Sequence, residues 1–273
     1  MANDAGAAFR ALHHQGKPFI VPNPWDLGSA RIFEAKGFQA LATTSSGFVF
    51  SRGRPEGTLT RDEVLAHSRE IVGAVGVPVS ADLEDGYADS LDQVAETYRL
   101  ARAVGLAGGS IEDFRQGAAD PRYGFEAAVD RVRAAVEGAG GGRGPGGDFV
   151  LTARCENYLY GLRDLGDTIR RLQAYQDAGA DVLFAPGLTT AEEVRAVVSS
   201  IDRPLNVIVG LKDTRFTVAE LAELGVARIS LGSSLFRCAA AATLQAVDEM
   251  LDGSFEFAQQ ATPFTELNRL FAG

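Results

Sequence analysis

The sequence predicts an α/β protein with the architecture of a (β/α)8 TIM-type barrel, and three observations lead to this prediction. Eight short apolar runs rich in β-forming residues alternate with longer helical patterns from one end of the chain to the other. The 273 residues divided among eight units give a spacing of about 34 residues, which is usual for this fold. Neither G-x-G-x-x-G nor G-x-x-x-x-G-K-[ST] is present, which disfavours a doubly wound sheet.

Each of the eight units consists of a short apolar run and a helical pattern. The expected strands are Phe19–Pro22, Phe38–Thr43, Val77–Leu83, Ala107–Glu112, Phe149–Arg154, Asp181–Phe184, Leu205–Val209 and Ala227–Leu231. The expected helices between them are Asp26–Lys36, Arg61–Val75, Leu91–Val104, Phe125–Glu137, Leu165–Ala178, Ala191–Ser200 and Val218–Leu224. Thr60 and Thr190 are suited to cap the helices that follow them. The glycines that follow helix ends suit the left-handed conformation needed there: Gly37, Gly105, Gly179 and Gly225.

We expect one barrel domain over residues 1–273, of which residues 234–273 form a C-terminal helical extension. After the eighth strand come the Ala-rich helical pattern Ser234–Leu251 and then Thr262–Phe271, whose apolar residues have helical spacing. This tail is too apolar to stand alone in water, so we expect it to fold back on its own barrel or to pack on a neighbouring subunit. The Gly-rich run Gly138–Gly147 is expected to be a flexible connection, because no helix start follows it.

Composition disfavours several classes of function. A net charge of −10 argues against nucleic acid and membrane as partners, because both require a basic surface. The two cysteines are too few for a disulfide framework, and the three histidines lack a metal-ligand spacing. The first residues lack the pattern of a secretory signal, and no apolar run reaches the length of a membrane span. We therefore expect a cytoplasmic protein.

The segment Val79–Tyr87 carries the strongest local indication of function. Its apolar run ends in the carboxylates of Asp82, Glu84 and Asp85, followed by a Gly-containing loop. Residues i and i+2 of a strand share one face, so Asp82 and Glu84 would converge at the strand end, where their repulsion favours a bound cation. Mg²⁺ is the usual hard divalent ion with such ligands. The alternative is an ordinary acidic loop after a buried strand.

Polar residues also follow the other expected strands. In a barrel of this kind the active site lies at the carboxyl ends of the strands. These ends carry Trp25-Asp26, Ser45-Ser46-Gly47, Glu112-Asp113, Arg154-Cys155-Glu156-Asn157, Asn206 slightly earlier, and Ser233-Ser234. A purely structural protein has little reason to collect Asp, Glu, Arg and Asn at one rim, so the pattern predicts a functional site there.

In order and position, these residues resemble the isocitrate lyase / phosphoenolpyruvate mutase superfamily over nearly the whole chain. The resemblance is carried by Ser45–Gly47, Asp82-x-Glu84-Asp85-Gly86-Tyr87, Ile111-Glu112-Asp113, Ala153-Arg154, Ala178-Gly179-Ala180-Asp181 and Pro204-Leu205-Asn206-Val207. Each segment alone is weakly specific. Their order, with each at a strand end or a strand entry, is specific.

The resemblance implies a Mg²⁺ ion, replaceable by Mn²⁺, that is held mostly through water by Asp82, Glu84 and Glu112. This ion would chelate the 2-oxo and carboxylate oxygens of a small anionic 2-oxo acid. The implied substrate contacts are Trp25, Ser45, Ser46, Gly47, Asp82, Arg154 and Asn206, with the backbone N–H groups of Ser46 and Gly47 on the carboxylate. Arg154 would neutralise the enolate oxygen that develops when a bond at C3 breaks. The implied catalytic set is Arg154, Glu112 and Glu56, the last near the metal.

A homo-oligomer is also implied, namely a tetramer built from two dimers.

Some of these residues have a structural alternative. The alternatives are a salt bridge from Arg154 to Glu156 or Asp82, a buried polar role for Asn206, and an exposed loop position for Glu56. Asp26 is expected to cap the helix that follows it. Cys155 is expected to be a small core residue, because no histidine has a predictable place beside it.

The chain departs from the superfamily in the loop after the fourth strand. The lyase branches carry there a Lys-Lys/Arg-Cys-Gly-His sequence whose cysteine is the acid–base group, whereas residues 114–123 read FRQGAADPRY. Retro-aldol cleavage needs a base for the hydroxyl group and an acid for the departing carbanion. Isocitrate lyase activity of ordinary strength is therefore not expected. The lysine- and asparagine-bearing lid of the mutase branch is also missing, and Thr44 stands where that branch has Trp.

A metal, a carboxylate clamp and an arginine are enough to decarboxylate a 3-carboxy-2-oxo acid, because CO₂ leaves without a general acid. We therefore expect a Mg-dependent carbon–carbon lyase, with oxaloacetate as the simplest substrate. Three alternatives stay open. They are carbon–phosphorus chemistry on phosphonopyruvate, weak cleavage of isocitrate or methylisocitrate, and a sensor that binds a 2-oxo dicarboxylate with little activity.

Overall fold

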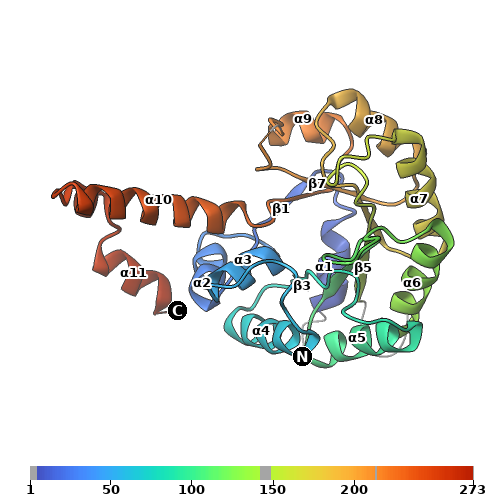
Figure 1. Ribbon diagram of the computed structural model, residues 1–273, viewed down its shortest axis with the longest axis horizontal. Coiled ribbons are helices and arrows are strands. Elements are labelled where there is room, and N and C mark those ends of the chain that lie inside the picture. The colour runs from blue at the N-terminus through green and yellow to red at the C-terminus, as the bar shows by residue number, and fades with distance from the viewer. Residues whose placement is uncertain (1–4, 142–148, 213, 273) are drawn as a thin grey trace.

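The eight strands are parallel and form one sheet in the order β1-β8-β7-β6-β5-β4-β3-β2. They are β1 (Phe19–Val21), β2 (Leu41–Ala42), β3 (Val79–Ala81), β4 (Gly108–Glu112), β5 (Val150–Arg154), β6 (Val182–Phe184), β7 (Leu205–Ile208) and β8 (Arg228–Ser230). In this computed structural model, which describes residues 5–141, 149–212 and 214–272, the sheet curves into a nearly closed barrel surrounded by helices (Figure 1). The predicted barrel is confirmed, and every strand lies inside its predicted range.

The side chain of Asn23 joins the two ends of the sheet. Its amide nitrogen donates to the carbonyl oxygens of Ala42, at 2.8 Å, and Thr43, at 3.2 Å. Its amide oxygen accepts from the backbone N–H groups of Leu231, at 2.8 Å, and Gly232, at 2.9 Å. One buried amide therefore satisfies backbone groups that follow β2 and β8, where strand pairing has stopped.

The helices between the strands cover the outside of the barrel. They are α2 (Leu27–Ala35), α4 (Arg61–Ala74), α5 (Leu91–Ala103), α6 (Phe125–Gly138), α7 (Leu165–Asp177), α8 (Ala191–Ser200) and α9 (Val218–Glu223). All seven were predicted. Thr60 and Thr190 cap α4 and α8 as expected, each within a capping box, and Asp26 caps α2 by accepting from the backbone N–H of Ser29. The four glycines expected to be left-handed have φ values from 80° to 107°.

Two α-helices of the described chain were not predicted. These are α1 (Ala5–Leu12), which precedes β1, and α3 (Ser45–Ser51), which follows β2. The segment Ser45–Gly47 is the first turn of α3, which Thr44 caps by accepting a hydrogen bond from the backbone N–H of Gly47. The sequence SSGFVFS contains Gly, Val and two Phe, all poor helix formers, so its helix depends on the cap and on tertiary packing.

The barrel interior contains a buried arginine. The guanidinium of Arg228 donates to Asn206 Oδ1 at 2.9 Å and to Thr152 Oγ1 at 3.0 Å, and it lies 3.3 Å from Nε2 of His13. Since Nδ1 of His13 lies 2.8 Å from the carbonyl oxygen of Phe9, the ring donates there and accepts from Arg228. Burial among these neutral partners lowers the pKa of Arg228 to about 9.

The C-terminal extension consists of α10 (Ser234–Leu251), the 3₁₀ helix η1 (Glu256–Gln260) and α11 (Phe264–Phe271). Figure 1 shows α10 projecting away from the barrel, with α11 turned back toward α2. Nζ of Lys36, the residue that caps the carboxyl end of α2, lies 4.0 Å from Oε1 of Glu266 in α11. The extension leaves large apolar side chains in solvent, including Leu251 at 81% and Phe264 at 87% exposure. Within one chain, the C-terminal extension therefore buries only part of its apolar surface.

Two remaining expectations concern the chain ends and loops. No helix in the described part of the chain combines the length and the hydropathy that crossing a membrane requires. Of the Gly-rich run Gly138–Gly147, residues 142–148 lie outside the described residues.

Candidate active site

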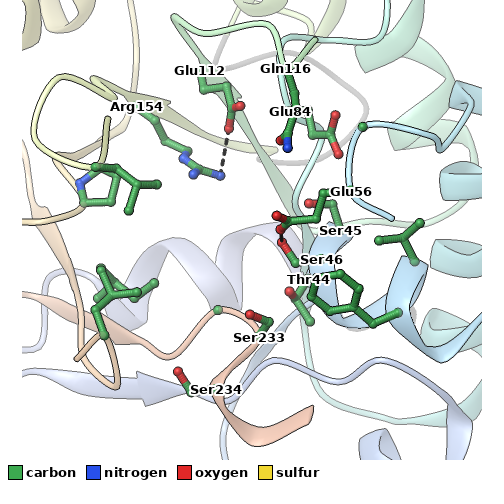
Figure 2. Close-up of a pocket in the computed structure, with 18 of the residues that line it drawn as sticks. Thr44, Ser45, Ser46, Glu56, Glu84, Glu112, Gln116, Arg154, Ser233 and Ser234 are labelled. Atoms are coloured by element: carbon green, nitrogen blue, oxygen red, sulfur yellow. Dashed lines mark hydrogen bonds and ion pairs between the residues drawn. The ribbon is translucent and has the colours of Figure 1, made fainter. Parts of the chain in front are cut away.

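A cavity of about 420 Å³ opens at the carboxyl ends of the strands. Figure 2 shows Arg154 and Glu112 on one side of this cavity, facing Ser45, Ser46 and Glu56 on the other. The polar lining consists of Thr44, Ser45, Ser46, Glu56, Glu84, Glu112, Gln116, Arg154, Tyr160, Ser233, Ser234 and Arg237. The strand ends thus bring together several of the rim residues that the sequence predicted, namely Ser45, Ser46, Glu112, Arg154, Ser233 and Ser234.

Arg154, the last residue of β5, lies at the centre of a cluster of carboxylates. Its Nη1 is 3.0 Å from Asp82 Oδ1 and 3.0 Å from Glu112 Oε2, and its Nε donates to Glu156 Oε1 at 2.8 Å. The guanidinium also lies over the ring of Phe184, 5.1 Å from its centre. The salt bridges considered for Arg154 are therefore present, and they hold its guanidinium at the cavity.

Asp82 is oriented by hydrogen bonds from both neighbouring strand ends. Ser45 donates to Oδ2 through its hydroxyl at 2.9 Å and its backbone N–H at 3.3 Å. Ser110 of β4 donates to Oδ1 at 3.4 Å. Asp82 also lines a smaller, deeper cavity of about 80 Å³ that contains Asn206 and Arg228. The carboxylate therefore sits between the mouth and the barrel interior.

Glu84 lines the cavity, but the backbone conformation that places it there differs from the predicted strand. The strand β3 ends at Ala81, so the alternation of strand side chains does not extend to residues 82–84. The backbone instead turns, with φ of +45° at Glu84 and +52° at Tyr87. Left-handed backbone at residues other than glycine is strained, and such strain is concentrated at functional sites.

The cluster at the strand ends contains more carboxylates than cationic groups. Burial, and then the negative charge of Asp82, raises the pKa of Glu84 to about 7. Burial raises the pKa of Glu112 well above its usual range, although Arg154 acts in the opposite direction. Burial also raises the pKa of Glu156. One guanidinium does not balance four nearby carboxylates, so the site has the electrostatics of a place for a further cation.

The donor chemistry of Asp82, Glu84 and Glu112 suits a hard divalent cation. Within the described ranges, no three Asp, Glu, His or Cys side chains are gathered closely enough to hold one ion by themselves. Mg²⁺ is commonly bound by one or two carboxylates with water molecules completing its octahedron. The residues present therefore fit an ion held largely through water, with Asp82, Glu84 and Glu112 as the residues that would hold it.

The predicted carboxylate clamp lies at the start of α3. The backbone N–H of Ser45 donates to Asp82, and that of Gly47 donates to Thr44. The cap of α3 therefore engages one of the two N–H groups, that of Gly47, that were expected to contact the substrate carboxylate. A Cβ atom at position 47 would lie 2.6 Å from Cγ2 of Thr44, so the first turn of α3 requires glycine there.

Three further predicted residues occupy different surroundings. Glu56 is exposed, but it lines the cavity and accepts a hydrogen bond from Ser46 Oγ (Figure 2). Trp25 packs edge-on against Phe236, with ring centres 5.6 Å apart, beside the mouth and outside the lining of the cavity. Asn206 is buried in the deeper cavity, where its amide bonds Ser230 and Arg228. Asn206 therefore has the buried, hydrogen-bonded position that was considered as the alternative to a substrate contact.

Two buried aspartates and several lining residues were missed as parts of the site. Asp113 accepts from the backbone N–H of Glu156 at 2.8 Å and from Arg171 at 3.0 Å, which fixes the segment after Arg154. Asp85 bonds the loop that contains Gln116. Their position directly after Glu84 and Glu112 was a usable indication, since adjacent residues point in different directions. Nothing local identifies the lining residues Gln116, Tyr160 and Arg237.

Comparison with known proteins places this arrangement in a family. The sequence model of the family described as phosphoenolpyruvate phosphomutase matches residues 9–251. The chain belongs to this family. It is therefore a phosphoenolpyruvate phosphomutase-family member of the isocitrate lyase / phosphoenolpyruvate mutase superfamily, as the resemblance implied.

Relatives of this family member cover most of its length. An uncharacterized protein of Mycobacterium tuberculosis (strain ATCC 25618 / H37Rv) is 35% identical over 95% of this chain and 94% of its own. The 2-methylisocitrate lyase of Escherichia coli (strain K12) is 31% identical over 85% of this chain and 79% of its own. The oxaloacetate decarboxylase of Bradyrhizobium sp. (strain ORS 278) is 28% identical over 89% and 84%. The relatives with a named activity here are enzymes that cleave small acids.

Solved structures of the superfamily share the fold. A lyase/mutase of Burkholderia cenocepacia is 51% identical, with a TM-score of 0.94 over 98% of this chain and 96% of that one. An oxaloacetate acetylhydrolase in complex with the product oxalate is 26% identical, with a TM-score of 0.86 over 98% and 94%. The similarity spans the barrel and the extension together.

Proposed function

We propose that this family member is a Mg²⁺-dependent carbon–carbon lyase that decarboxylates a small 3-carboxy-2-oxo acid, with oxaloacetate as the simplest substrate. One observation carries the proposal. Arg154 stands in a cluster of carboxylates at the mouth, while no Cys, His or Lys lines that mouth in the described parts of the chain. The site therefore suits a reaction that develops an enolate and whose leaving group needs no proton.

The reaction places negative charge on one oxygen. When the bond between C3 and C4 breaks, its electron pair passes to C3 and the 2-oxo oxygen, and C4 departs as neutral CO₂. Mg²⁺, when bound, would polarise the 2-oxo group as a Lewis acid. The guanidinium of Arg154, held by Asp82 and Glu112, is oriented to donate to the enolate oxygen. Water then protonates C3, which gives the saturated 2-oxo acid.

The opposite side of the cavity suits the carboxylate next to the 2-oxo group. The backbone N–H of Ser46 lies in the first turn of α3, where the helix dipole favours an anion. The hydroxyl of Ser46 contacts Glu56, and Ser45 orients Asp82. We assign Glu56 and Glu112 the role of flanking acids that keep the donors of Ser46 and Arg154 in place.

The assay that tests this proposal compares oxaloacetate, phosphonopyruvate, isocitrate and methylisocitrate with Mg²⁺. We expect oxaloacetate to react fastest, with activity lost in excess chelator and restored by Mg²⁺ or Mn²⁺. Fastest turnover of phosphonopyruvate would establish the carbon–phosphorus alternative, which the name of the matched family favours. Fastest cleavage of isocitrate or methylisocitrate, or full activity in chelator, would contradict the proposal. Tight binding of a 2-oxo acid without turnover would indicate a sensor.

We also propose that the C-terminal extension packs on another copy of this chain, within a tetramer built from two dimers. The extension exposes Leu244, Leu251, Phe255 and Phe264 in one chain, each at 65% or more. Large apolar side chains left in solvent along one segment favour its packing against another subunit.

Light scattering should therefore give the mass of a homo-oligomer at micromolar concentration. Truncation before Thr262 should lower that mass, because it removes Phe264 and the rest of α11. Leu91→Ser, which changes a leucine of 44% exposure on the barrel, should leave the mass unchanged. A monomer for the full chain at this concentration would contradict the expectation.

A further inference from the structure

The segment that follows β4 is a small hairpin at the edge of the mouth. Phe114 and Arg122 form an antiparallel bridge. The backbone N–H of Arg115 donates to the carbonyl oxygen of Pro121 at 2.6 Å, and that of Tyr123 donates to Asp113 at 2.9 Å. Residues 114–123 thus have an internal backbone structure of their own.

Arg115 and Tyr123 fasten this hairpin to the loop after β3. Arg115 donates to Asp85 Oδ2 at 2.7 Å, to the carbonyl oxygen of Ala88 at 2.6 Å, and to Asp89. The hydroxyl of Tyr123 donates to the same Oδ2 of Asp85 at 2.7 Å. Charge-assisted bonds to a buried carboxylate are strong and directional. The hairpin is therefore held against the loop that carries Glu84.

Gln116, next to Arg115, reaches the cavity from the hairpin. It lines the cavity together with Glu84 and Arg154. On its other side it packs on the loop that carries Glu56, since a Cβ atom at Gly57 would lie 3.1 Å from Cγ of Gln116. The fastened hairpin thus places a primary amide at the entrance of the site.

A primary amide restricts the chemistry at this position. It donates and accepts hydrogen bonds but does not exchange a proton near neutral pH. A Lys or Arg here would stabilise the departing carboxylate most strongly before it leaves, and this stabilisation would be lost as the group becomes neutral CO₂. An amide can also orient the carboxylate, and because it is neutral it stabilises the carboxylate of the bound substrate less, so less stabilisation is lost as CO₂ forms.

We propose that Gln116 is the contact that recognises the departing C4 carboxylate, and that Arg115 is a positioning residue that holds Gln116 over the cavity. This assignment rests on the proposed function. It names the part of the site that separates a 3-carboxy-2-oxo acid from a 2-oxo acid without that carboxylate.

The test compares Gln116→Leu with the wild-type chain on two ligands. Oxalate resembles the enolate portion of the substrate and has no C4 carboxylate, so its Mg²⁺-dependent binding reports on the rest of the site. We expect Gln116→Leu to raise KM for oxaloacetate about 10-fold, the usual effect of losing a hydrogen bond to a charged group. Oxalate should bind within about twofold of the wild type. Gln39→Leu, an exposed glutamine before β2 at the opposite end of the barrel, is the matched control and should change neither value.

Arg115 requires a readout that a loss of stability alone would not produce. Arg115→Met should raise KM for oxaloacetate as Gln116→Leu does, accelerate amide hydrogen exchange in residues 113–123 and leave oxalate binding intact. Arg115→Lys should restore part of the KM value.

Two results would overturn the assignment. An unchanged KM for oxaloacetate in Gln116→Leu would exclude the contact, and an equal weakening of oxalate and oxaloacetate would show a general disturbance of the site. Failure of the proposed function looks different. Wild-type protein would then neither bind oxalate nor release CO₂ from oxaloacetate, and the assignment would fall with it.

Discussion

Replacing Arg154 by lysine is expected to lower kcat for oxaloacetate by about 10²–10³-fold and to change KM much less. Losing a preorganised donor to a developing oxyanion has an effect of this size. Lysine keeps the positive charge but cannot reproduce the planar fork with which Arg154 contacts Asp82, Glu112 and Glu156 at once. A charge that matters mostly when the enolate forms affects kcat more than substrate binding.

Steady-state kinetics with saturating Mg²⁺ measures this effect. Arg133→Lys is the matched control, because Arg133 is exposed on α6 and pairs with Asp130 at 2.8 Å, far from the carboxylate cluster of Arg154. Thermal unfolding of both variants separates loss of chemistry from loss of fold. A rise in KM with kcat unchanged would assign Arg154 to uniform substrate binding and contradict its proposed role.

Replacing Asp82 by alanine should abolish Mg²⁺-dependent activity and weaken the binding of metal and 2-oxo acid together. We expect kcat/KM to fall at least about 100-fold, since changes around a metal ligand alone reduce affinity or activity 10- to 100-fold. The fold should remain, because the side chain lies at the rim with 19% exposure and not among the apolar core.

Titration calorimetry with Mg²⁺ and with oxalate, together with circular dichroism, checks this expectation. Asp177→Ala offers a matched control, because Asp177 is exposed at the end of α7, on the face of the barrel away from the site. Binding of Mg²⁺ by Asp82→Ala with wild-type affinity would remove Asp82 from the metal site. It would leave the role of Arg154 to be judged separately.

Much of the fold could be predicted from the sequence, because the patterns that indicate strands, helices and caps lie within short stretches of the chain. Each β-rich run was followed by a helix pattern, caps such as Thr190 and Glu193, and a glycine such as Gly179 at the helix end. The exceptions are short or poorly helical in composition. The helix α3 forms from SSGFVFS because Thr44 caps it and because Phe48 stacks on His67 of α4, with ring centres 3.8 Å apart. That contact joins residues that no periodicity relates.

The sequence predicted many of the residues that form the site, but it did not predict how their side chains are arranged. Arg154, Glu112 and Asp82 follow strands, and the fold places all strand ends together. The position of Glu84 came from a left-handed turn, which strand alternation does not describe. Trp25 stands at a strand end too, yet Phe236 and Phe33 hold its ring outside the cavity lining.

The sequence by itself determined the barrel, the order of its units, the acidic and basic residues of the rim, and the absence of Cys, His and Lys from residues 114–123. These features depend on residue type and on spacing along the chain. Tertiary structure alone decided which carboxylates surround Arg154 and that Asp85 fastens Arg115, so that Gln116 faces the cavity. Apart from the Arg154–Glu156 pair, those contacts join residues 30 or more positions apart, and only closure of the barrel brings them within hydrogen-bonding distance.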